Sequence, residues 1–139
     1  MTQVLGTGGS GFIGLPCSDR IYVLGYCNDI CSWLKRADVY VSVSRFEGNP
    51  NTVLEALACG CPVVASDIPA HVDILKPPHG ILVPPESAEA ISNALSAALT
   101  SGRAARQDFL AVREQLLQRS PRSVAAQYLE LYQAMVEDE

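Results

Sequence analysis

The chain has 139 residues, of which 48% are hydrophobic and 18% are charged, and its formal net charge is −5. These values predict one globular domain over residues 1–139, and the negative charge argues against binding to nucleic acid. No apolar run approaches the roughly 18 residues of a membrane span and no signal-peptide pattern opens the chain, so we expect no transmembrane segment and a cytoplasmic location.

Strand-like and helix-like patterns alternate in the first part of the chain. Helical periodicity occurs in residues 28–37, and in residues 49–59 with Asn49 as N-cap and Pro50 at the first helical position. Apolar runs that read as buried strands occupy residues 4–5, 21–24, 39–43, 62–65 and 80–83. The alternation predicts an α/β fold, a Rossmann-like parallel sheet with helices on both faces.

From Ser87 onward the pattern is wholly helical, with breaks at Gly102 and Pro121. Three apolar faces follow one another. Their residues are Ala88, Ile91, Ala94, Leu95, Ala98 and Leu99; then Phe109, Leu110, Leu116 and Leu117; then Val124, Tyr128, Leu131, Tyr132 and Met135. We therefore expect a helical C-terminal end.

The five cysteines are an odd number for a disulfide framework, and we expect reduced thiols that serve as small core residues. A zinc site is an alternative, but structural zinc sites favour pairs separated by two to four residues. The four candidate ligands are Cys27, Cys31, Cys59 and Cys61, and the last two are separated by only one residue.

Two glutamates are candidates for ligand binding. Glu55 lies in a stretch that is apolar on nearly every side, so we expect a buried carboxylate that either needs a partner such as Arg45 or serves a ligand hydroxyl. Glu47 lies in the loop between the strand of residues 39–43 and the next helix. Loops of this kind border the ligand crevice of a parallel sheet, although an acid followed by glycine is also a common surface turn.

Residues 44–67, from Ser44 through Glu47 and Glu55 to Asp67, resemble the signature of the group 1 retaining glycosyltransferases of the GT-B fold, in which two glutamates are separated by seven residues. The resemblance extends over residues 20–135 and leaves the first nineteen residues uncertain. It implies that the chain is the C-terminal domain that binds a nucleotide-sugar donor, such as a UDP- or GDP-sugar. It also implies that the reaction retains the anomeric configuration and needs no metal or other cofactor.

The resemblance implies roles for the matching residues. Glu47 would be the catalytic-site carboxylate that accepts hydrogen bonds from the donor sugar, and Glu55 would hold the ribose hydroxyls. The backbone near Tyr26 and Cys27 would border the base. The implied donor site also contains residues around the helix start, where amides would face the diphosphate, and a glycine after the first strand: Gly48, Asn49, Pro50, Asn51, Thr52 and Gly8.

Two parts of the family pattern have no match in this chain. One is the N-terminal domain that binds the acceptor, and the other is the pair of basic residues that clamp the diphosphate ahead of residue 4. We therefore expect the isolated chain to bind nucleotide weakly and not to transfer sugar by itself. The alternative is a non-catalytic nucleotide-binding or interaction module, or one half of a two-chain enzyme.

A rival reading comes from the glycine-rich segment Thr7 to Gly14, which is similar to the phosphate-binding turn of nicotinamide-dependent epimerases and dehydratases. Pro16 interrupts the helix that this turn requires, and no Tyr is followed four residues later by Lys. We therefore interpret these glycines as a strand-to-loop segment of the glycosyltransferase fold that is followed by a shortened or altered helix.

Overall fold

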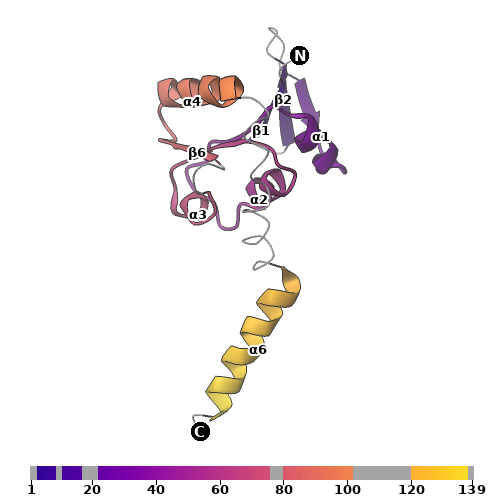
Figure 1. The fold of residues 1–139 in the computed structure, drawn as a ribbon, viewed down its shortest axis with the longest axis vertical. Coiled ribbons are helices and arrows are strands. Elements are labelled where there is room, and N and C mark those ends of the chain that lie inside the picture. The colour runs from indigo at the N-terminus through magenta and orange to yellow at the C-terminus, as the bar shows by residue number, and fades with distance from the viewer. Residues whose placement is uncertain (1–2, 9–10, 17–21, 76–79, 102–119, 138–139) are drawn as a thin grey trace.

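The computed structural model of the chain describes residues 3–8, 11–16, 22–75, 80–101 and 120–137 (Figure 1). Its centre is a six-stranded sheet in the order β3-β2-β1-β4-β5-β6. The strands are β1 (Gln3–Gly8), β2 (Gly11–Pro16), β3 (Tyr22–Gly25), β4 (Val39–Ser42), β5 (Val63–Ser66) and β6 (Gly80–Val83). Each of the five apolar runs predicted as a strand coincides with one of them.

Four of the strands form the predicted parallel sheet. β1 pairs in parallel with β4, β4 with β5, and β5 with β6, and the β4–β5 ladder ends at Ser42 opposite Ala65. Parallel neighbours need a crossover connection between them, and α2 and α3 provide the crossovers from β4 to β5 and from β5 to β6. The predicted Rossmann-like parallel sheet is therefore confirmed.

The glycine-rich segment departs from its prediction. We expected a loop and a shortened helix after β1, but β2 pairs antiparallel with β1, with Gly8 opposite Gly11, and β3 pairs antiparallel with β2. Phe12 and Ile13 favour a strand, and Pro16 cannot continue a helix. The strand-turn-helix unit that a nicotinamide cofactor would need is therefore absent from the described residues of this segment.

The helices are α1 (Ile30–Arg36), α2 (Asn51–Ala58), α3 (Pro69–Val72), α4 (Ala88–Ser101) and α6 (Pro121–Glu137). α1 and α2 confirm the predicted helices, but the N-cap of α2 is Pro50 and not Asn49. Asp29 caps α1, and its hydrogen bonds from the Ser32 hydroxyl and backbone N–H lower the pKa of its carboxyl. The single turn of α3 is too short for a helical period to predict it.

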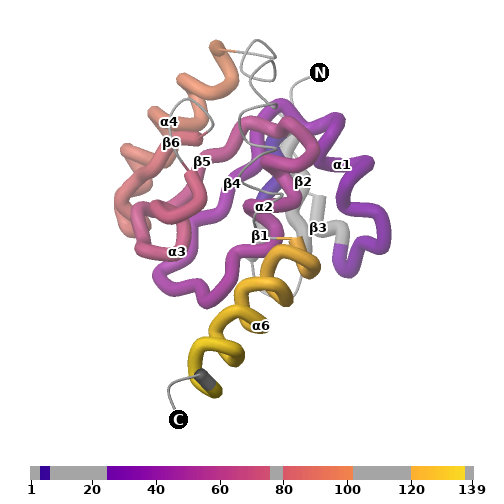
Figure 2. The backbone as a smooth tube through the Cα atoms, turned by 60° about the horizontal axis from the view of Figure 1, so that its bottom comes forward, coloured from indigo at the N-terminus to yellow at the C-terminus, as the bar shows by residue number. Residues whose placement is uncertain are grey.

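Helices cover both faces of the sheet, as predicted (Figure 2). Alternate strand residues point to opposite faces, so Tyr40 joins the apolar layer beneath α1 and α2, whereas its neighbour Val39 joins the layer beneath α4. The first layer also contains Leu34, Leu57 and Val63, and the second contains Val64, Val83, Ala94 and Ala98. Burial on both faces explains why the strands read as continuous apolar runs.

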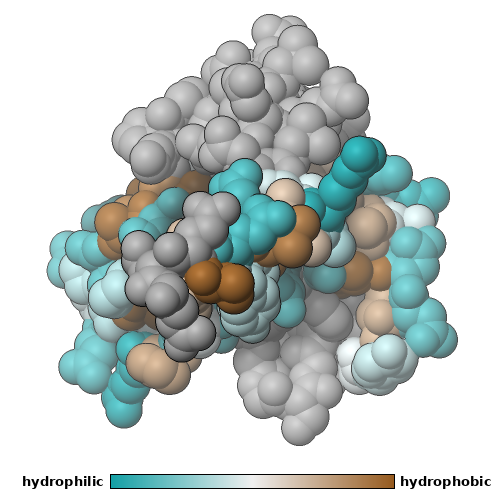
Figure 3. All heavy atoms as spheres, turned by 90° about the horizontal axis from the view of Figure 1, so that it is seen from below, coloured by the Kyte–Doolittle hydropathy of each residue, from teal (hydrophilic) through white to brown (hydrophobic). Residues whose placement is uncertain are grey.

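The C-terminal part is helical where the structure describes it. Ala94 and Ala98 confirm the predicted inner face of α4, whereas the apolar face predicted around Phe109 to Leu117 lies outside the described residues. α6 projects away from the sheet (Figure 1), and its apolar residues, including Tyr128, Leu131 and Met135, are exposed. Viewed from that end, hydrophobic and hydrophilic side chains alternate over the surface (Figure 3). None of the described helices is long and apolar enough to cross a membrane.

Gly80 tests the packing between β6 and the first apolar layer. A Cβ at this position would lie 2.7 Å from Cδ2 of Leu75 and 3.2 Å from the backbone oxygen of Val63. Because Leu75 is buried, we expect Gly80→Ala to lower the free energy of unfolding by about 1–3 kcal/mol in urea denaturation. Gly48→Ala is the control, since a Cβ there meets no heavy atom within 4 Å. Equal stability of the two variants would contradict this packing.

Candidate donor-binding site

A pocket of about 220 Å³ opens beyond the carboxyl end of β4, where the chain leaves the sheet and enters α2. Its lining combines the end of β4 with the loop and the first turn of the helix. The lining residues are Tyr40, Ser42, Glu47, Asn49, Pro50, Asn51, Thr52 and Val53. The structure thus brings together five of the residues implied by the resemblance, namely Glu47, Asn49, Pro50, Asn51 and Thr52.

The carboxylate of Glu47 is held at one oxygen. The hydroxyl of Ser44 donates a hydrogen bond of 2.6 Å to Oε1, while Oε2 has no hydrogen-bond partner among the described residues. Glu47 is half-buried and lines the pocket. An oriented carboxylate with one open oxygen is suited to accept a hydrogen bond from a ligand hydroxyl.

The start of α2 contributes backbone N–H groups. Pro50 has no N–H, and the amides of Asn51, Val53 and Leu54 donate to the backbone oxygens of Asn49 and Pro50. The Thr52 amide, by contrast, has no acceptor among the described residues. The Asn51 amide, which we expect among those that face the diphosphate, donates to the backbone oxygen of Asn49, so its role toward a ligand stays a prediction. The free amide of Thr52 and the positive end of the helix dipole are the groups suited to an anion.

Glu55 differs from its prediction. We expected a buried carboxylate, but its side chain is exposed and lies outside the pocket lining. The buried residues of α2 are Val53, Ala56 and Leu57, which form one face, and the other face is turned to solvent. Glu55 is one helical turn after Asn51, so both lie on the same side of α2. Its carboxylate therefore needs no partner from the fold.

Gly48 is exposed, and the fold itself does not require a glycine at this position. Its φ angle is not positive, and a Cβ built there would meet no heavy atom within 4 Å. The close backbone approach that we predicted at this position would therefore have to come from a ligand.

Three predicted site residues lie at the same edge of the sheet but outside the pocket lining. β3 runs in the same direction as β1 and β4, so Tyr26 and Cys27, which follow β3, are at the edge where the pocket opens. Three strand spacings separate β3 from β4, or about 14 Å. Gly8 ends β1, the neighbour of β4. Tyr26 is 87% exposed, and Gly25 before it adopts a φ of 66°.

The cysteines divide by exposure. Cys61 is buried in the first apolar layer and confirms the prediction of a core thiol, whereas Cys31 is exposed, where that prediction is wrong. The pKa of the Cys59 thiol is raised to about 11, mainly because the thiol is partly buried. A hydrogen bond with the Cys31 thiol and the nearby charge of Glu55 raise it further. Within the described part of the chain, no three His, Cys, Asp or Glu side chains are grouped to hold a metal ion.

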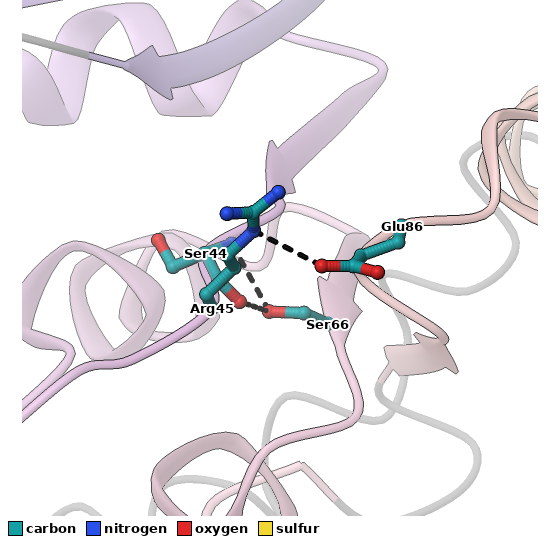
Figure 4. A network of polar contacts seen from close by, with 4 residues as sticks. All are labelled: Ser44, Arg45, Ser66 and Glu86. Carbon is teal, nitrogen blue, oxygen red and sulfur yellow. Dashed lines mark hydrogen bonds and ion pairs between the residues drawn. The ribbon is translucent and has the colours of Figure 1, made fainter.

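Arg45 pairs with a residue from another loop. Its Nε lies 3.2 Å from Oε1 of Glu86, which follows β6 (Figure 4). Both side chains are largely exposed, and ion pairs of this kind contribute little stability. Arg45 therefore does not neutralise Glu55, the role we considered for it from the sequence.

Sequence reasoning missed the polar residues beneath the loop. Ser66 at the end of β5 and His71 on α3 are fully buried, and Ser66 bonds to Ser44 of the loop after β4 (Figure 4). The only sequence signal is a serine that directly follows an apolar strand. That signal does not reveal which loop the serine contacts, because the contact depends on the order of the strands.

Comparison with known proteins gives a consistent result. The family model described as "Glycosyl transferases group 1" matches residues 10–101. The lipopolysaccharide core biosynthesis mannosyltransferase LpcC of Rhizobium leguminosarum bv. viciae is 40% identical over 80 residues, which are 57% of this chain and 23% of that protein. An N-acetylgalactosaminyltransferase of Campylobacter jejuni, which acts on N,N'-diacetylbacillosaminyl-diphospho-undecaprenol, is 29% identical over 122 residues, 87% of this chain and 32% of that protein.

Solved structures agree with the fold. Sucrose-phosphate synthase from Thermosynechococcus elongatus superposes with a TM-score of 0.64 at 27% identity, over 77% of this chain and 27% of that one. TarM superposes with a TM-score of 0.62 at 24% identity, over 78% of this chain and 22% of that one, and this likeness concerns the fold alone. The chain thus spans between a fifth and a third of the length of these proteins.

Proposed function

The chain belongs to the group 1 glycosyltransferases, and from this premise we propose that it binds the nucleotide-sugar donor at the carboxyl edge of its parallel sheet. The observation that carries the proposal is the pocket after β4, in which the Glu47 carboxylate and the first turn of α2 face the same space. A nucleotide sugar has hydroxyls at one end and phosphates next to them, and the pocket offers a group suited to each.

The charges of the groups in the pocket favour one orientation of the donor. A carboxylate repels phosphate but accepts hydrogen bonds from sugar hydroxyls, so Glu47 is the group for the sugar. The free Thr52 amide and the helix dipole favour the diphosphate. No metal ion enters this proposal, as the resemblance to the family implies.

The nucleoside extends from the pocket along the sheet edge in this proposal. Glu55 lies on the same side of α2 as Asn51 and accepts the ribose hydroxyls, a role that its exposure permits. The backbone at Tyr26 and Cys27, which follow β3 at the same edge of the sheet, borders the base. Main-chain contacts of this kind do not specify one base, and the printed names of the relatives differ in the sugar transferred. The proposal therefore names a nucleotide sugar as a class.

Glu55→Gln tests the proposal at the nucleoside. We expect the substitution to weaken nucleoside diphosphate binding by about 1–3 kcal/mol, because it removes the charged acceptor of the ribose hydroxyls. Stability should hardly change, since Glu55 is exposed. Calorimetric titration with UDP, GDP and ADP measures the effect, and Glu130→Gln on α6 is the matched control. Unchanged affinity in folded Glu55→Gln would refute the role of Glu55.

We further propose that sugar transfer needs a second domain or partner chain that holds the acceptor. Positioning of two reactants supplies roughly 7–11 kcal/mol of barrier lowering, and this chain spans less than a third of the relatives that transfer sugars. Helix-dipole stabilisation of a diphosphate is worth only about 0.3–1 kcal/mol at an exposed site, so we expect micromolar to millimolar nucleotide affinity.

The isolated chain should therefore bind nucleotide without efficient turnover. Incubation with UDP- and GDP-sugars and mixed acceptors, followed by measurement of released nucleoside diphosphate, checks this expectation. Turnover on the order of 1 per second or faster would show that the chain is a complete enzyme.

A further inference from the structure

We propose that Ser66 and His71 are positioning residues for the donor sugar, because they hold the loop that orients Glu47. This inference rests on the proposed function of Glu47 and goes beyond it by extending the site into the buried end of β5. Neither residue lines the pocket, so both would act through the loop and not by contact with the ligand.

The first link is a pair of hydrogen bonds between Ser66 and Ser44. The β4–β5 backbone ladder ends at Ser42, two residues before Ser44. Beyond it, the Ser66 hydroxyl accepts a bond of 3.1 Å from the backbone N–H of Ser44 and donates one of 2.6 Å to the backbone oxygen of Ser44 (Figure 4). A buried side chain thus replaces the missing ladder pair and holds both polar groups of one loop residue.

The second link joins Ser44 to the site. Its hydroxyl donates to Oε1 of Glu47 at 2.6 Å. With its backbone held by Ser66, the hydroxyl of Ser44 has a defined position, and the carboxylate is directed with Oε2 open toward a ligand. Phe46, which lies between them in the sequence, is 85% exposed, so its ring does not anchor this part of the loop. Hydrogen bonds restrain Ser44 and Glu47 instead.

The third link is His71, and the groups around its ring show which ring nitrogen carries the proton. Nδ1 of His71 lies 2.9 Å from the backbone oxygen of Ser66 and 3.2 Å from its hydroxyl. A carbonyl oxygen only accepts, and the single hydroxyl proton of Ser66 already goes to Ser44, so Nδ1 carries the proton and donates to Ser66. Nε2 is then a buried acceptor with no partner among the described residues.

A buried Nε2 without an acceptor or donor among the described residues is unfavourable for folding, which argues that His71 has a role besides stability. The bond from Nδ1 holds the end of β5, so that the Ser66 hydroxyl faces Ser44. The three residues come from α3, β5 and the loop after β4 and form one continuous chain that ends at Glu47.

The test compares each nucleotide sugar with its own nucleoside diphosphate. The probes are UDP-glucose with UDP and GDP-mannose with GDP, titrated by calorimetry or by NMR where binding is weak. Ser66→Ala and Ser44→Ala should weaken binding of the nucleotide sugar roughly tenfold relative to the diphosphate, because only the sugar contacts Glu47. Ser44→Thr keeps the hydroxyl and should retain the wild-type ratio. Ala94→Gly, on the buried face of α4, controls for lost stability.

His71 is tested by a second pair of variants. His71→Asn keeps an N–H donor at about the position of Nδ1 and should retain the affinity ratio, whereas His71→Leu removes the donor and should behave like Ser66→Ala. If Ser66→Ala does not fold, the half-buried Ser44→Ala still decides the matter.

Two kinds of failure are distinguishable. If wild-type protein binds neither the sugars nor the diphosphates, the proposed function fails and this inference falls with it. If wild-type protein binds and Glu47→Gln alters the ratio, but Ser44→Ala and Ser66→Ala leave it within twofold of wild type, only the positioning role is wrong.

Discussion

The parallel pairing of β1, β4, β5 and β6 determines where the helices, the two apolar layers and the pocket lie. Parallel neighbours cannot be joined by a tight turn, so the chain crosses over through α2 and α3 and returns to begin each new strand at the same edge. Both faces of these strands are consequently buried, in one layer around Tyr40 and another around Val39. All four strands also end at a common edge, which gathers the loops that follow them. The pocket, the start of α2 and the polar chain from His71 to Glu47 all lie at this edge.

Two groups of opposite charge preference, a carboxylate and the amino end of a helix, lie at this edge. A half-buried carboxylate, Glu47, faces the same pocket as the amino end of a helix. A simple anion would be repelled by the first and attracted by the second, whereas a ligand with hydroxyls next to phosphates satisfies both. The hydrogen-bonded chain beneath the loop matters because the ladder between β4 and β5 ends before the loop begins. Among the described residues, Nε2 of His71 has no hydrogen-bond partner, and this unfavourable group belongs to the hydrogen-bonded series that ends at Glu47.

Sequence patterns predicted the regular parts of this fold and the local part of the site. The apolar runs at residues 39–43 and 62–65 predicted buried strands because burial on both faces leaves no polar alternation. The loop from Glu47 to Thr52 was found because its residues are contiguous. Glu55 was expected to be buried because Ala56 and Ala58 were counted alike as apolar, although Ala56 is buried and Ala58 is exposed. The antiparallel β2 was missed because its glycines were read as a strand-to-loop segment. The bond from Ser66 to Ser44 depends on which strands become neighbours, and a contact across 22 residues is not written in any local pattern.

Mapping of amide chemical shifts by NMR would show whether the carboxyl edge of the sheet binds a nucleotide sugar. Uniformly ¹⁵N-labelled protein would be titrated with UDP-glucose and GDP-mannose, with glucose and mannose alone as controls. We expect the largest shifts at Glu47 to Glu55, led by the amide of Thr52, with smaller shifts at Tyr26 and Cys27 and none along α4. Shifts confined to α4 or α6, or no shifts at millimolar nucleotide sugar, would show that this edge is not the binding site.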